Sequence, residues 1–312
     1  MSARVVLRAP AKVNLSLVVL AKRADGYHEL DTVLLALPLA DELALEPGAG
    51  AADELLVTGP AAAGVPGDGS NLALRAVDAM RALARARGRP APGLRVELLK
   101  RVPAQAGLGG GSSDAVAAAL GACEIFGLAP DLPEVTTELA RLGSDCPFFL
   151  RARAGGLARC TGRGERVEPW PDPRLPWTIA LVTPGFGCAT GDVYRALQVP
   201  SKSAPAAFER AGLGIDLARD RARLRNDLEA AAERSHPPLA AFRARLETLA
   251  PGAFRLAGSG SSFFGLCADE AEAEDLLARL AASDEARRYG LRGRWVLPAR
   301  RPPADAKNSK SQ

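Results

Sequence analysis

The sequence predicts an α+β protein in which strands dominate the first part of the chain. Short apolar or alternating runs, which are typical of strands, come first, and longer segments with helical periodicity follow them. This order favours an α+β layout over a doubly wound parallel sheet, in which strands and helices alternate. The 312 residues suffice for one large domain or two ordinary ones, and a hydrophobic content of 47% can fill their cores.

Each element of the first half follows from local pattern. Ser70 and Asn71 are cap residues ahead of an amphipathic helix over 72–87, which Gly88 ends. An alanine-rich helix follows residue 114, and a further helix is expected near 132–142. The expected strands are 4–8, 13–20, 32–37, 55–58 and 94–99.

The second half begins after a change in composition. A Gly/Arg-rich stretch over 151–166 is followed by a Pro/Trp-rich joint over 168–177, so we expect domains at 1–167 and 168–298. Residues 299–312 lack apolar anchors and are expected to form a disordered tail. The remaining pattern predicts strands at 178–183, 254–257, 263–266 and 294–297, and helices at 191–197, 217–233, 239–249 and 270–282.

The most informative segment is a glycine loop between a strand end and a helix, Pro-Ala-Gln-Ala-Gly-Leu-Gly-Gly-Gly-Ser-Ser-Asp-Ala at 103–115. Glycines let a backbone approach an anion closely, and Ser112, Ser113 and Asp114 are expected to cap the helix. The first amides of a helix, with the helix dipole behind them, bind phosphate groups. The segment therefore predicts a phosphate-binding loop.

Two common nucleotide-binding motifs are excluded for this loop. A Walker loop ends in Gly-Lys-Ser/Thr, and the chain contains no Gly-Lys pair. The dinucleotide motif G-x-G-x-x-G needs a third glycine where Ser112 stands. A flexible linker remains the alternative, but an apolar helical run follows at once over 115–126, and this favours phosphate binding.

Composition narrows the class of protein further. Forty basic and 36 acidic residues give a net charge of +4, which is too balanced to favour nucleic acid but suits an anionic substrate. There is no apolar run of membrane-spanning length and no signal peptide, so a cytoplasmic protein without a membrane partner is expected. The five cysteines lie far apart without a C-x-x-C pair, which predicts reduced thiols and no zinc site.

The glycine loop resembles the glycine motif of the GHMP small-molecule kinases, a family that includes galactokinase, homoserine kinase and mevalonate kinase. Other motifs resemble the branch that acts on cytidine-diphosphate-linked methylerythritol in the non-mevalonate isoprenoid pathway. These motifs lie at 10–17, 22–30, 142–150 and 257–264. They occur in the same order as in that branch, so the resemblance covers most of the chain.

The resemblance implies a two-domain fold, with a ribosomal-S5-like N-terminal domain, a ferredoxin-like C-terminal domain and ligands in the cleft between them. It implies ATP as the phosphoryl donor and, through the transfer itself, Mg²⁺, with Ser112 or Ser113 as candidate ligands. The ATP-binding residues that it implies are Asn71, near the adenine, and the loop residues Pro103, Ala104, Gln105, Ala106, Gly107, Leu108, Gly109, Gly110, Gly111, Ser112 and Ser113. Gln105 and Ala106 stand where the family often has glycine or another small residue, so a tighter loop entry is expected.

Lys12 and Asp145 are the candidate catalytic residues. The chain has only six lysines among forty basic residues, and Lys12 lies in an apolar strand where an ordinary surface cation is not expected. Asp145 stands directly ahead of the apolar run Cys-Pro-Phe-Phe. By resemblance, Asp145 accepts or orients the proton of the substrate hydroxyl, with Lys12 beside it. The alternatives are a lysine that extends its amine to solvent and an ordinary turn cap.

The substrate side is predicted from rare residues. Only three tyrosines and two histidines occur, and Tyr27, His28 and Tyr194 fall within motifs. The family places an aromatic ring at each tyrosine position around the cytosine, with the histidine reading its edge, and such stacking contributes about 1–3 kcal/mol per base. Thr190 would share a helix face with Tyr194. Asn14 and Lys100 match positions that contact the methylerythritol and diphosphate parts of the substrate, CDP-methylerythritol.

Two alternatives stand beside this interpretation. A related kinase could act on another small alcohol such as homoserine or mevalonate, but Tyr27, His28 and Tyr194 favour a cytidylylated substrate. A nucleotide- or RNA-binding module without catalysis could share the N-terminal fold. The near-neutral charge and the presence of both Lys12 and Asp145 argue against that module.

Overall fold

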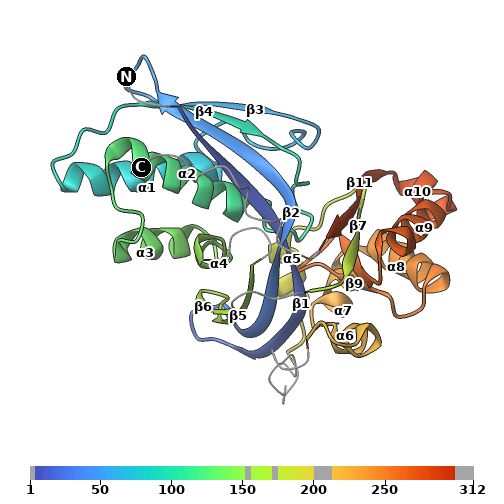
Figure 1. Ribbon diagram of the computed structural model, residues 1–312. Helices are drawn as coiled ribbons and strands as arrows, with labels where there is room; N and C mark the ends of the chain where they lie inside the picture. Colours follow the sequence, from blue (N-terminus) through green and yellow to red (C-terminus); the bar gives the residue numbers. More distant parts are fainter. Residues whose placement is uncertain (1–3, 152–155, 171–174, 200–212, 299–312) are drawn as a thin grey trace, which may run out of the picture.

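The computed structural model describes residues 4–151, 156–170, 175–199 and 213–298 (Figure 1). The described residues form two sheets, each with its own helices, and this mixture confirms the predicted α+β organisation. The tail expected to be disordered, 299–312, lies outside the described residues. Within the described ranges, we find no helix that is both long and apolar enough to cross a membrane.

The first sheet has seven strands in the order β3-β4-β2-β1-β8, with β5 paired to both β2 and β6. Its strands are β1 (Val5–Lys22), β2 (His28–Pro47), β3 (Glu54–Thr58), β4 (Leu94–Leu99), β5 (Leu157–Gly162), β6 (Arg166–Trp170) and β8 (Arg225–Asn226). The domain boundary expected between residues 167 and 168 therefore falls inside β6, and β8 brings a later part of the chain into the same sheet.

The long hairpin of β1 and β2 lies in the middle of this sheet. The prediction of two separate strands over 4–8 and 13–20 is wrong, because β1 runs through both. The register shifts between Pro10 and Lys12. A proline has no N–H to donate to the ladder, and such an irregularity lets the strand continue past it.

Four helices cover one face of the first sheet (Figure 1). They are α1 (Leu72–Ala86), α2 (Gly110–Phe126), α3 (Pro133–Leu142) and α4 (Cys146–Arg151). The alanines of α2 let it pack closely, since Ala115, Ala118 and Ala122 have no exposed surface. This helix places the glycine loop at the edge of the core.

The starts of α1 and α2 differ from the predicted caps. Asn71 alone caps α1, because its Oδ1 accepts the backbone N–H of Ala73 at 2.9 Å. The expectation that Ser112, Ser113 and Asp114 cap α2 is wrong, because the helix begins at Gly110 and has no side-chain cap. Gly109, at φ 70°, ends the loop in the left-handed conformation and leaves the first amides of the helix free of a capping side chain.

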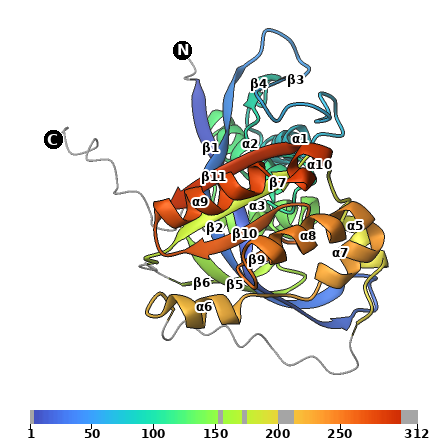
Figure 2. The ribbon, with the colours of Figure 1, turned by 90° about the vertical axis from the view of Figure 1, so that its right-hand side faces the viewer.

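The second sheet has the order β11-β7-β10-β9. Its strands are β7 (Thr178–Pro184), β9 (Phe254–Leu256), β10 (Phe263–Cys267) and β11 (Leu291–Pro298), and the helices of this half are α5 (Thr190–Arg195), α6 (Leu217–Arg223), α7 (Glu229–Ser235), α8 (Pro237–Leu249), α9 (Glu270–Ala281) and α10 (Asp284–Tyr289). Figure 2 shows α8, α9 and α10 on the outer side of this sheet. The prediction of continuous helix over 217–233 is wrong, because β8 pairs with β1 and separates α6 from α7.

Strand β1 joins the two halves through the alternation of its side chains. The odd-numbered residues of 11–15 are fully buried in a core shared with β7 and β10. Lys12 and Asn14 lie on the opposite face of the strand, because successive side chains alternate. One strand therefore supplies both the contact between the halves and a polar surface.

A buried lysine fixes the start of the glycine loop. Lys100 is 2% exposed, and its Nζ donates to Asp41 and, at 2.7 Å, to Asp114. Asp41 also accepts the backbone N–H groups of Arg101 and Val102, at 2.5 and 2.8 Å. Two carboxylates around one ammonium leave an excess negative charge, and burial, opposed by Lys100 and reinforced by Asp41, raises the pKa of Asp114 to about 7. The cluster ties β2, the end of β4 and α2 together.

We expect the replacement of Lys100 and the replacement of Asp114 to lower the stability of the protein by different amounts. Lys100→Met should lower the free energy of unfolding by about 3–5 kcal/mol, because two carboxylates would remain buried without a cation. Asp114→Asn should lower it by no more than about 1.5 kcal/mol, because the amide oxygen still accepts from Lys100 and the excess charge is gone. Urea unfolding at neutral pH measures both values. Equal losses would contradict this account of the cluster.

Candidate active site

A cavity of about 1250 Å³ is lined by residues from both halves of the chain. Of the predicted site residues, it is lined by Lys12, Asn14, Tyr27, His28, Asn71, Lys100, residues 103–112, Asp145, Thr190 and Tyr194. Ser113 is the exception, because its hydroxyl is buried away from the cavity and has no hydrogen-bond partner among the described residues. The fold thus gathers in one place segments that are far apart in the sequence.

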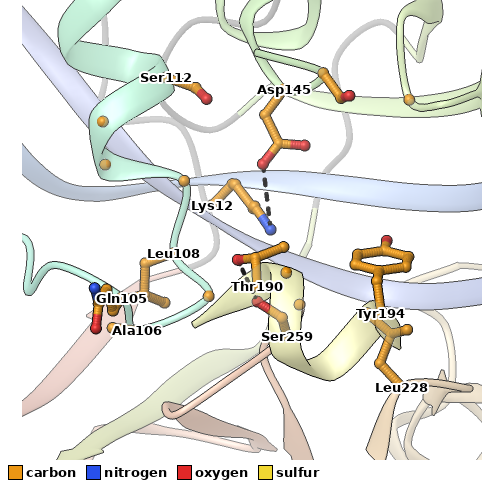
Figure 3. A pocket seen from close by; sticks show the side chains of 18 of the residues that line it. Lys12, Gln105, Ala106, Leu108, Ser112, Asp145, Thr190, Tyr194, Leu228 and Ser259 are labelled. Atoms are coloured by element: carbon orange, nitrogen blue, oxygen red, sulfur yellow. Dashed lines mark hydrogen bonds and ion pairs between the residues drawn. The ribbon is translucent and has the colours of Figure 1, made fainter. Parts of the chain in front are cut away.

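Lys12 and Asp145 form an ion pair in the cavity (Figure 3). Lys12 Nζ lies 3.6 Å from Asp145 Oδ2, and the Asp145 side chain is 31% exposed while Lys12 is 4% exposed. Asp145 belongs to the turn that leads into α4. The Lys12 backbone N–H donates to the Leu108 carbonyl at 2.9 Å, which holds the glycine loop beside the lysine. An ammonium and a partly exposed carboxylate therefore meet next to the loop.

Asn14 orients the lysine. Its Oδ1 accepts from Lys12 Nζ at 2.9 Å, and its Nδ2 donates to Thr32 Oγ1 at 2.9 Å. The Thr32 hydroxyl in turn donates to the Ser16 carbonyl at 2.6 Å. This chain of donors fixes the amide so that its oxygen faces the ammonium.

The glycine loop is held from the second half of the chain. A Cβ at Gly107 would lie 1.8 Å from the Ala257 carbonyl oxygen, so no larger residue fits there. The Cys188 backbone N–H donates to the Gln105 carbonyl at 2.9 Å. Gln105 itself has φ 52°, a conformation that favours glycine.

Aromatic side chains gather at the other side of the lysine–aspartate pair. Figure 3 shows Tyr194 across from Gln105 and Ala106, with Lys12 and Asp145 between. The rings of His28 and Tyr194 have centroids 5.2 Å apart at an interplanar angle of 33°. Burial, reinforced by the charge of Lys22, lowers the pKa of His28, so its imidazole is neutral at pH 7 and can both donate and accept a hydrogen bond.

The side chains of the other predicted residues are hydrogen-bonded to groups of the protein itself. Thr190 lies on α5 with Tyr194, and its hydroxyl shares a hydrogen bond of 2.8 Å with Ser259. Asn71 lines the cavity, but its Nδ2 donates to the Pro66 carbonyl at 2.7 Å while its Oδ1 caps α1. Lys100 also lines the cavity, with its ammonium bound to carboxylates. Their roles in binding a ligand stay predictions.

Several cavity residues escape the sequence analysis. Asp114 was expected only as a cap, yet it lines the cavity beside Lys100. Arg163 also lines it, and its one sequence signal is its place between two glycines in the Gly/Arg-rich stretch. Arg163 lies in no motif with an assigned role, and the place of Asp114 in the glycine-loop motif indicates only a helix cap.

The cavity offers few ligands for a metal ion. Among the described residues, we find no group of three or more His, Cys, Asp and Glu side chains that could hold one. The carboxylates that line the cavity are Asp114, bound to Lys100, and Asp145. Of the two candidate serines, only Ser112 reaches the cavity. A magnesium ion would therefore fit here chiefly as a partner of phosphate oxygens.

The sequence of the chain is similar to known proteins over most of its length. Residues 71–153 match the model of the GHMP kinases N terminal domain, and residues 206–286 match that of the GHMP kinases C terminal domain. Over 283 residues the chain is 41% identical to the 4-diphosphocytidyl-2-C-methyl-D-erythritol kinase of Pelotomaculum thermopropionicum, covering 89% of this chain and 94% of the relative. It is 38% identical to the enzyme of the same name from Cereibacter sphaeroides, covering 94% and 97%.

Solved structures show the same relationship. A crystal structure of a 4-(cytidine 5'-diphospho)-2C-methyl-D-erythritol kinase aligns with a TM-score of 0.69 at 33% identity, covering 94% of this chain and 98% of the other. A homoserine kinase from Cytophaga hutchinsonii aligns with a TM-score of 0.67 over 96% of this chain and 95% of the other, but at 17% identity it shares only the fold. The chain belongs to the 4-diphosphocytidyl-2-C-methyl-D-erythritol kinase family of the GHMP kinases.

Proposed function

We propose that this chain transfers the γ-phosphoryl group of ATP to the 2-hydroxyl of 4-(cytidine 5'-diphospho)-2-C-methyl-D-erythritol. The observation that carries the proposal is the Lys12–Asp145 pair, with the glycine loop on one side and Tyr194 on the other. A kinase needs its phosphate donor and its alcohol on opposite sides of the reacting groups. The named activity of the relatives supports the same substrate.

Asp145 is the group that acts on the hydroxyl. Its carboxylate is partly exposed and faces the cavity, so a substrate hydroxyl can donate a hydrogen bond to it. In the transition state the carboxylate orients the hydroxyl or takes its proton as the oxygen attacks phosphorus. Lys12 Nζ lies 3.6 Å from Asp145 Oδ2, and from this position its ammonium would stabilise the negative charge of the transferring group.

The glycine loop is the proposed phosphate site. The first amides of α2 lack a capping side chain and face the cavity with the helix dipole behind them. Magnesium, when bound with ATP, would neutralise charge on the phosphates. Ser112 is the loop hydroxyl placed to contact that ion or a phosphate oxygen.

Tyr27, His28 and Tyr194 form the proposed cytosine site. Aromatic faces stack on any base, while the neutral imidazole of His28 can read the donors and acceptors of one base edge. Homoserine and mevalonate offer no base to these groups. The aromatic cluster therefore favours the cytidylylated alcohol over those substrates.

One assay tests the proposal directly. ADP release is measured in three separate reactions that contain CDP-methylerythritol, homoserine or mevalonate as the alcohol, each at the same concentration. Turnover is expected with CDP-methylerythritol alone. Comparable or faster turnover of either other alcohol would contradict the substrate assignment.

Asp145→Asn should lower kcat by about 100-fold or more, because the amide cannot accept the hydroxyl proton. ATP binding should stay near the wild-type value, since the side chain faces the alcohol. Single-turnover kinetics and ATP titration measure the two quantities. A wild-type kcat would remove Asp145 from the mechanism.

Lys12→Met keeps most of the side-chain volume and should also slow the chemical step by about 100-fold. Because Lys12 and Asp145 act on the same transition state, the double variant should be no slower than the slower single variant. Thermal unfolding provides the control for folding. A large loss of stability with retained turnover would instead make Lys12 a structural residue.

Tyr27→Ala and Tyr194→Ala should each raise KM for CDP-methylerythritol by about 10-fold or more, given the stacking energy of a base. Tyr→Phe at either position should be nearly silent, because the ring face does the binding. The KM for ATP should not change. If it rises instead, these rings belong to the adenine site and the proposed orientation of the two nucleotides is reversed.

A further inference from the structure

Two hairpin turns meet at the wall of the cavity that carries Tyr27. The turn between β1 and β2 carries Tyr27, and the turn between β5 and β6 carries Arg163. The guanidinium carbon of Arg163 lies 4.5 Å from the centroid of the Tyr27 ring, which is within the range of a cation–π contact. Both side chains line the cavity, and Tyr27 remains 50% exposed.

Arg163 is set by its turn. Glycines flank it on both sides with φ 75° and 112°, and its backbone N–H donates to Glu165 Oε2 at 2.5 Å. Its guanidinium also reaches the Ala140 carbonyl at 3.4 Å, a long and weak contact. Across the described part of the chain, no ion pair within 4 Å includes Arg163. The flat face of the guanidinium is therefore available to the tyrosine ring.

Within the described part of the chain, the hydrogen bonds at Tyr27 involve its main chain and not its ring. Its backbone is ordered by the Arg23 N–H, which donates to the Tyr27 carbonyl at 2.8 Å, and by Asp25 Oδ1, which accepts the Tyr27 N–H at 3.1 Å. These contacts fix the main chain and leave the ring half exposed. The hydrogen bond from Arg23, together with a smaller contribution from Arg163, lowers the pKa of Asp25, so both cations face this turn.

We propose that Arg163 is a positioning residue that covers one face of Tyr27 and holds the ring so that its other face stacks on the cytosine of the substrate. This assignment rests on the proposed function, because it names how that site orders its base-binding wall. A ring that is fixed before binding loses less freedom on binding, which strengthens the stack. Arg163 then acts on affinity for the nucleoside and leaves the chemical step unchanged.

The competing role for a cavity arginine is a direct contact with the substrate diphosphate. The two roles separate with cytidine, which carries no phosphate, and CDP, which does. Loss of a positioning residue weakens both ligands by the same factor. Loss of a phosphate contact weakens CDP alone.

The experiment is a binding titration of cytidine and CDP to the full chain and to Arg163→Met. We expect the Kd of both ligands to rise by about 2- to 5-fold, the range that a cation–π contact supports. The kcat with CDP-methylerythritol and the Kd for ATP should not change. Arg166→Met is the matched control, because Arg166 is exposed on the same hairpin and does not line the cavity.

A double-mutant cycle with Tyr27→Ala provides the second test. If Arg163 acts through the ring, Arg163→Met should have no further effect on cytidine binding once Tyr27 is alanine. A full additive loss, or a loss for CDP alone, would overturn the assignment. A wild-type chain that binds neither cytidine nor CDP would contradict the proposed function itself, whereas wild-type binding with unchanged Arg163→Met contradicts only the role of Arg163.

Discussion

The glycine loop passes between two buried lysines, and the geometry of the cavity depends on this arrangement. A Cβ at Gly109 would lie 3.0 Å from Lys12 Cγ, and one at Gly110 would lie 3.4 Å from Lys100 Nζ. Burying an ammonium is unfavourable unless polar partners surround it, so each lysine recruits side chains from other strands and turns. The loop amides and the Lys12 ammonium consequently lie close together, which is the electrostatic setting that a phosphate site requires. The charge of Lys100 is balanced by its two carboxylates and adds little to this setting.

The second half of the chain holds this loop as firmly as the first. Arg292, on β11, donates to the Ala104 carbonyl at 2.7 Å and to the Pro184 and Phe186 carbonyls. The same half supplies the carbonyl of Ala257 that packs against Gly107. Any relative movement of the two halves would therefore disturb the glycine loop and the position of Tyr194 together, because α5 in that same half carries Tyr194.

How much of the site can be predicted from the sequence depends on whether a residue lies in a local sequence pattern. Lys12 and Asp145 can be recognised from the sequence as candidates for the cavity, because a rare lysine in an apolar strand and an aspartate before an apolar run are local patterns. The partners of Lys100 cannot be recognised in this way, since Asp41 reaches it only through the register of β2 on β4. The contact of Arg163 with Tyr27 joins two turns that no local pattern connects. Residues that carry a local pattern are thus predictable as cavity residues, and contacts set by strand pairing are not.

The different surroundings of the two lysines fit the different roles that we propose for them. Lys100 donates to two carboxylates and ties three elements together, so its charge serves the fold. Lys12 donates one hydrogen bond to Asn14, and its 3.6 Å separation from Asp145 is an ion pair too long for a hydrogen bond. An ammonium has three N–H donors. Among the residues that the structure describes, Lys12 thus keeps donors for an incoming phosphoryl oxygen, and this freedom suits a catalytic cation better than full neutralisation would.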